Sequence, residues 1–138
     1  MKKLFLREGN LVVLGAVILA ALLEWPSLRH AGTTVPKDLG DPLAQAYLLS
    51  WPGHILPINP GQLWNTNTFF PEPDSFAYSD SLLGYAPFSF IGEGSQSAIV
   101  RINLLCVAVR ALSFIGAYAL VRQLGSNWLG AVLGASRP

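Results

Sequence analysis

Two long apolar stretches determine the organisation predicted for this chain. Residues Leu11–Leu23 are apolar or small without interruption, and with its flanks this stretch extends over Leu6–Leu28. Residues Ala98–Val121 form the second apolar stretch, with Arg122 at its far end. Because a helix needs roughly 20 residues to cross the hydrocarbon core of a bilayer, we expect each stretch to form one membrane helix.

The first stretch allows two interpretations. The bases Lys2, Lys3 and Arg7 precede it, and a basic start before a short apolar core is typical of a signal peptide. However, no small-x-small cleavage site follows directly, and Trp25 stands where tryptophan commonly anchors a membrane helix at the interface. We therefore expect an uncleaved helix. A cleaved, secreted product is disfavoured because the second apolar stretch is also long enough to cross.

Prolines and acidic residues are concentrated between the two apolar stretches. Nine of the ten prolines and seven of the eight acidic residues lie between Glu24 and Ser97, where Arg29 and Lys37 are the only lysine or arginine residues. Because cytoplasmic loops are enriched in lysine and arginine, we expect the N-terminus in the cytoplasm and this loop outside. Two helices of opposite direction then return Arg122 to the cytoplasmic side.

Two short elements are expected inside this loop. Asp41 and Pro42 have the residue types of a helix N-cap and first helical position, and Pro52–Gly53 is expected to end that helix. We expect it to be amphipathic and to lie along the membrane surface. Residues Leu82–Ile91 are apolar, interrupted by glycine and proline and too short to cross, which predicts a re-entrant or interfacial segment.

Two features indicate that further helices belong to this protein. Arg110 falls near the middle of the second stretch, where an arginine costs about 2.5–3.5 kcal/mol on insertion scales. The chain offers no obvious carboxylate at that depth, so we expect the partner of Arg110 on a helix outside this sequence. A third apolar run, Trp128–Ala135, is far too short to cross. The chain therefore has the character of an N-terminal fragment.

These expectations define an all-α membrane protein in four parts. Residues 1–26 form the cytoplasmic N-terminus and first helix, 27–97 the Pro-rich extracytoplasmic loop, 98–122 the second helix, and 123–138 a cytoplasmic turn and truncated third helix. With 51% hydrophobic and 12% charged residues, the composition differs from that of soluble domains, where about a quarter of residues are charged. A net charge of +1 without a basic patch excludes nucleic acid as a partner. The single cysteine, Cys106, excludes an intrachain disulfide.

Several short motifs resemble a known family. They are Asp38–Pro42 followed by Tyr47, Trp51 and His54, then Leu63–Asn67 and Phe69–Pro71, and finally Tyr78–Asp80 and Leu82–Gly84. In this order, after a basic N-terminus and one helix, they resemble the start of the multi-spanning membrane glycosyltransferases of the C-type fold. The resemblance covers roughly residues 5 to 135, the first quarter or so of such a protein. It implies a multi-pass protein of the bacterial inner membrane that moves a sugar from a polyprenyl-phosphate carrier to an acceptor on the outer face.

The resemblance also implies where the chemistry lies. Glycosyl transfer needs a carboxylate to take the acceptor's proton, and the family places an acidic residue in this first outer loop. Asp41 is the best match, assisted by Asp38, and the two carboxylates could hold Mg²⁺ or Mn²⁺ through oxygen. Asp80 is a candidate second carboxylate. For Asp41 and Asp80 the competing interpretation is helix capping.

Other residues are candidates for substrate binding. Arg101, at the outer end of the second helix, is expected to bind the carrier's phosphate or to serve as a snorkelling anchor. His54 is a candidate base or metal ligand, or a hydrogen-bonding residue of the loop. Trp64 could stack on a sugar or anchor the loop at the interface, and Tyr78 accompanies Asp80 in its motif. The alternative function is a non-catalytic multi-spanning protein, such as a transporter or assembly subunit.

Overall fold

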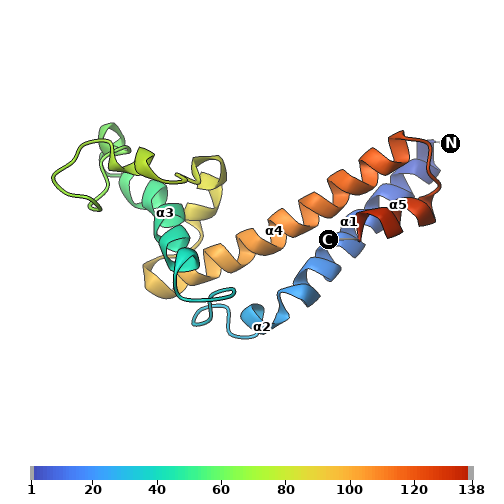
Figure 1. Cartoon of the computed structure of the whole chain (residues 1–138), viewed down its shortest axis with the longest axis horizontal. Helices are drawn as coiled ribbons and strands as arrows, with labels where there is room; N and C mark the ends of the chain where they lie inside the picture. The colour runs from blue at the N-terminus through green and yellow to red at the C-terminus, as the bar shows by residue number, and fades with distance from the viewer. Residues whose placement is uncertain (1, 137–138) are drawn as a thin grey trace. The chain divides into compact units, whose positions relative to one another are not determined.

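The computed structural model describes the backbone of residues 2–136 and the side chains of residues 8–136. Every regular element in this part of the chain is helical, which confirms the predicted all-α class (Figure 1). The elements are α1 (Lys2–Leu23), α2 (Trp25–Leu28), α3 (Asp41–Ile55), η1 (Pro60–Gln62), η2 (Ser75–Tyr78), η3 (Leu83–Phe90), α4 (Gly94–Gln123) and α5 (Trp128–Ala135), where η denotes a 3₁₀ helix.

The chain divides into two compact units. Unit 1 consists of residues 1–25 and 106–138, and unit 2 of residues 26–105. Helix α4 therefore contributes its first half to unit 2 and its second half to unit 1.

Unit 1 is built on the close approach of α1 and the second half of α4, which run side by side in opposite directions (Figure 1). Ala16 and Ala20 of α1 are buried against Ala111 of α4, with Phe114 and Ile115 packed around them. Small residues at such a contact let two helix backbones approach closely, as they do between membrane helices. Asn127 caps α5 by accepting a hydrogen bond from the Gly130 amide at 2.8 Å. Helix α5 coincides with the short apolar run Trp128–Ala135 noted in the sequence.

One ion pair joins α4 to α1 and a second joins α4 to the residue that follows α1, and the second overturns the expectation for Arg110. Arg110 Nε lies 2.5 Å from Glu24 Oε1, and Arg122 Nε lies 3.0 Å from Glu8 Oε1. The carboxylate expected on a missing helix is therefore present within this chain. It was missed because Glu24 lies at the end of the first apolar stretch, 86 positions before Arg110, and meets Arg110 only because α1 and α4 run antiparallel (Figure 1).

The first apolar helix ends earlier than predicted from the flanks of its apolar stretch. Helix α1 ends at Leu23, and the separate short helix α2 begins at Trp25. Pro26 supplies no amide hydrogen to continue the ladder of α1. Within the described residues, α4 is the one helix that is long and apolar enough to cross a membrane, while the apolar part of α1, Glu8–Leu23, is shorter.

The core of unit 2 lies between α3, η3 and the first half of α4. Ala46 and Leu49 of α3 are buried against Ile102 and Leu105 of α4, with Leu82 and Phe88 packed at the edge. At Gly53 the backbones of α3 and η3 meet so closely that a Cβ would lie 2.3 Å from the Ser89 carbonyl oxygen. The apolar side of α3 is thus covered by protein, which differs from the membrane-surface helix expected from its pattern.

Helix α3 begins one residue earlier and ends two residues later than predicted. The N-cap is Gly40 rather than Asp41. No side-chain hydrogen bond caps this end of the helix. At the other end the helix continues through Pro52 to Ile55. Proline removes a single backbone bond inside a helix, and the burial of Pro52 and Ile55 offsets that loss.

A buried asparagine fastens the loop after α2 to α4. Asn103 is 1% exposed, and its Nδ2 lies 3.0 Å from the carbonyl oxygen of Ala31 and 2.8 Å from that of Thr34. The Ile99 carbonyl, on α4 itself, is a third acceptor at 3.0 Å. Among the described residues the buried Oδ1 of Asn103 has no hydrogen-bond partner.

Candidate functional site

An open cavity of about 1010 Å³ lies within unit 2. Its walls come from α3, from the end of η3, and from the turn that leads into α4. This volume is at the upper end of the range of about 300–1,000 Å³ found for small-molecule sites. The polar side chains that line it are Tyr47, Ser50, His54, Ser89, Glu93, Ser95 and Arg101. Two residues predicted from the sequence, His54 and Arg101, therefore belong to one cavity.

Arg101 forms part of the cavity wall instead of projecting toward a membrane surface. Its side chain is buried, with 6% of the residue exposed. Nε donates to the carbonyl oxygen of Ile91 at 2.8 Å, and Nη2 donates to that of Gly92. The expected snorkelling anchor is therefore wrong, because the guanidinium is turned back onto the chain that precedes α4. Arg101 fixes the turn immediately before Glu93.

Glu93 is the carboxylate of this cavity, and sequence reasoning missed it. It lies between Gly92 and Gly94, whose φ angles are +65° and +80°. These left-handed conformations favour glycine, and a Cβ on Gly92 would lie 2.7 Å from Ser97 Oγ. The signal in the sequence was Gly92-Glu93-Gly94 directly before the long apolar helix, a turn that presents one acidic side chain.

His54 lies in the last turn of α3 and is held by aromatic packing. Its ring centroid is 5.7 Å from that of Trp51, and Trp51 Nε1 donates to the Leu63 carbonyl at 2.7 Å. An imidazole and a carboxylate on the walls of one cavity provide groups that accept protons or bind hydroxyl groups. The side chains of Tyr47 and Phe90 add aromatic surface to the same cavity.

Asp38 and Asp41 are exposed and do not line this cavity. Asp38 Oδ1 accepts a hydrogen bond from the Gly40 amide at 2.8 Å and so stabilises the turn before α3. Asp41 is the first residue of α3, where its charge complements the helix dipole. Within the described residues, no group of three or more His, Cys, Asp or Glu side chains is arranged to hold a metal ion.

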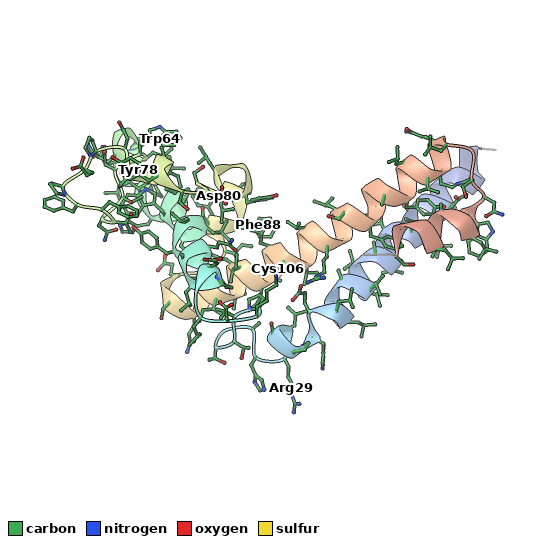
Figure 2. All side chains as sticks on the ribbon, in the orientation of Figure 1. Arg29, Trp64, Tyr78, Asp80, Phe88 and Cys106 are labelled. Carbon is green, nitrogen blue, oxygen red and sulfur yellow. The ribbon has the colours of Figure 1, made fainter. Side chains whose placement is uncertain are left out.

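The remaining predicted residues lie elsewhere in unit 2 (Figure 2). Trp64 packs against Phe76 with ring centroids 5.9 Å apart, and Tyr78 packs against Phe69 at 5.7 Å. Asp80 is exposed and does not cap η3, because the N-cap position is Leu82 with a φ of 51°. None of these three lines the cavity with His54 and Arg101. The capping interpretation of Asp80 is therefore wrong, and its catalytic role remains a prediction.

Comparison with known proteins gives no family assignment. No protein-family model, curated protein or solved structure matches this chain.

Proposed function

We propose that this chain is the N-terminal part of a membrane glycosyltransferase, with α1 and α4 as antiparallel membrane helices. Support for the membrane comes from α4, which is long and apolar enough to cross, with only 17% of its most apolar window buried. A core helix of a soluble protein would be mostly covered by protein. The ion pairs Glu24–Arg110 and Glu8–Arg122 give the charged groups of these helices partners, which lowers the cost of placing them in a bilayer.

The observation that carries the enzymatic part is the cavity of unit 2. It combines a carboxylate, an imidazole, hydroxyl groups and aromatic rings, which are the groups that bind a sugar and accept a proton from an acceptor hydroxyl. The reaction follows from the motif resemblance: a sugar passes from a polyprenyl-phosphate carrier to an acceptor on the outer face. In this proposal Glu93 competes with Asp41 for the role of general base, and His54 lines the same cavity as Glu93.

A pair of substitutions tests this function in the protein in its native membrane. If Glu93 is the base, Glu93→Gln lowers transfer from a polyprenyl-phosphate sugar by about 10²-fold or more, while Asp41→Asn has little effect. The opposite result identifies Asp41 as the base. Glu72→Gln is the matched control, because Glu72 is an exposed acid of the same loop that does not line the cavity. Wild-type transfer in both Glu93→Gln and Asp41→Asn would remove the enzymatic proposal.

The alternative is a non-catalytic membrane subunit, in which the Glu24–Arg110 pair serves only to hold the end of α1 against α4. An absence of transfer activity in the wild-type protein, with both helices inserted, would favour this alternative.

A further inference from the structure

The segment from Trp64 to Phe76 in unit 2 is a loop whose two ends are hydrogen-bonded to each other. The Phe76 amide donates to the Trp64 carbonyl at 2.9 Å, and Ser75 Oγ donates to the Thr66 carbonyl at 3.1 Å. Thr66, Ser75 and Phe76 are buried, with 7%, 2% and 0% of each residue exposed. The base of this loop is therefore ordered, and residues 67–73 form its tip.

The tip presents two phenylalanine side chains to solvent. Phe69 is 64% exposed and Phe70 is 87% exposed. The Glu72 amide donates to the Phe69 carbonyl at 2.9 Å and closes a turn at the tip, and Pro71 and Pro73 have fixed φ angles. A backbone that is already ordered loses little conformational freedom on binding. The aromatic pair is therefore preorganised for contact, and aromatic side chains contribute strongly to binding at protein interfaces.

Tyr78 adds a third exposed ring beside the tip. Its ring centroid lies 5.7 Å from that of Phe69, and 53% of the residue is exposed. We call Phe69, Phe70 and Tyr78 the aromatic surface of the loop. The faces of aromatic rings carry partial negative charge and attract ammonium and guanidinium groups. The aromatic surface therefore suits an apolar or a cationic ligand, and the surrounding charges distinguish the two.

The charged residues next to the aromatic surface in the sequence are all acidic. Glu72 and Asp74 follow the two phenylalanines, and Asp80 is two residues after Tyr78. All three acids are exposed, and their carboxylates form no ion pair or hydrogen bond with the described residues. Residues 38–100 contain no lysine or arginine that could neutralise them. The loop therefore complements a positively charged ligand, and it repels phosphate groups and anionic lipid surfaces.

We propose that this loop docks an arginine-containing segment of a partner protein. The guanidinium groups stack on the aromatic surface and pair with the carboxylates of Glu72 and Asp74. Arginine fits better than lysine, because its planar group can stack on a ring and can pair with a carboxylate through two hydrogen bonds. This interaction is separate from glycosyl transfer and does not require the cavity of unit 2.

The test is binding of a fluorescent synthetic peptide to the full chain in phosphatidylcholine nanodiscs, whose zwitterionic lipid does not attract a basic peptide. The probe is a short peptide of alternating arginine and serine, and the matched peptide has glutamate in place of arginine. We expect saturable binding of the arginine peptide, weakened by added salt, and no binding of the glutamate peptide. Absence of binding by the arginine peptide, or equal binding of the two peptides, would overturn the proposal.

Variants separate the contribution of the rings from that of the charges. Phe70→Ser is expected to lower the affinity for the arginine peptide about fivefold or more. The double variant Glu72→Gln, Asp74→Asn is expected to lower it about threefold or more, and asparagine tolerates the left-handed φ of 54° at residue 74. Asp38→Asn is the control, an exposed acid outside the loop whose substitution keeps the oxygen that accepts from Gly40. Unchanged affinity in Phe70→Ser, or an equal loss in Asp38→Asn, would contradict docking at this loop.

Insertion of the tip into lipid is the competing outcome, and labelling with a water-soluble maleimide distinguishes it. Phe70→Cys places a thiol at the tip, and the wild type, whose single cysteine is Cys106, gives the background. We expect rapid labelling of Phe70→Cys in nanodiscs and protection from labelling by the arginine peptide. Slow labelling in nanodiscs that becomes rapid in denaturant would place the tip in the bilayer and overturn the proposal.

Discussion

Glu24 and Arg110 show how unit 1 accommodates charge in apolar helices. The Glu24 side chain is 8% exposed and that of Arg110 is 51% exposed, so the carboxylate depends on its partner more than the guanidinium does. A buried charge that loses its partner keeps its desolvation cost without compensation. The two halves of this ion pair are therefore expected to respond differently to substitution.

Replacing Arg110 should destabilise the chain more than replacing Glu24. Arg110→Gln leaves the buried carboxylate unpaired, and we expect a loss of ~3 kcal/mol in the free energy of unfolding. Glu24→Gln should cost less, because the half-exposed guanidinium can turn away from α1.

The measurement is denaturant-induced unfolding in detergent for both single variants and the double variant. Because both substitutions remove the same contact, their effects should be clearly non-additive. Arg29→Gln is the control, since Arg29 is exposed and projects away from the ribbon (Figure 2). Strict additivity of the two single effects would show that the pair contributes nothing.

At the scale of elements, the contact between α3 and η3 shapes unit 2. Leu49, Pro52 and Ile55 of α3 are buried, and at Gly53 the two backbones approach more closely than any side chain allows. This contact positions His54, in the same turn, at the wall of the cavity. The packing of α3 against η3 and the geometry of the candidate site are therefore linked.

A single methyl group at Gly53 should disturb this contact. The Cβ of Gly53→Ala would lie 2.3 Å from a backbone oxygen of Ser89, so the two elements must separate. Overpacking of this kind typically costs about 1–3 kcal/mol, and thermal unfolding should register it. Gly61→Ala is a suitable comparison, because its Cβ would meet only Asn59 Oδ1 at 3.5 Å. Equal melting temperatures for the two variants would contradict the described contact.

Patterns within one element were predicted from the sequence, whereas contacts between distant elements were not. The run Trp128–Ala135 matches α5, and Ala98–Val121 lies inside α4. The end of α3 was predicted too early because tertiary burial of Pro52 outweighs a lost backbone bond. Glu93 was missed because its position depends on the turn that Arg101 fixes before α4, and the partner of Arg110 was missed because it depends on the antiparallel packing of α1 and α4. Hydrophobic periodicity carries no information about such turns.

At the scale of the whole molecule, the charge distribution predicts a topology. We predict that the bases at the start of α1 and at the end of α4 face the cytoplasm and that the acidic segment between Glu24 and Ser97 faces outward, because cytoplasmic segments are enriched in lysine and arginine.

Reporter fusions test the topology directly. Fusions at Lys37 and Asp74 should report an outside location, and fusions at Lys3 and Gln123 an inside location, because lysine and arginine favour the cytoplasmic side. Fusions at Gly125 and Ser136, which are uncharged residues, extend the same comparison to the chain after α4. An inside signal at Asp74 would reverse the orientation and remove the outer-face assignment of the cavity in unit 2.

The hydrogen bonds of Asn103 impose an order of events during synthesis. The carbonyl groups of Ala31 and Thr34 are made 72 and 69 residues before their partner. At about 5–20 residues per second, the ribosome needs about 4–14 s to reach Asn103 from Ala31. During that interval Ala46 and Leu49 also lack Ile102 and Leu105, which follow within the same turns of α4. The nascent loop therefore depends on water, lipid or a chaperone until α4 emerges.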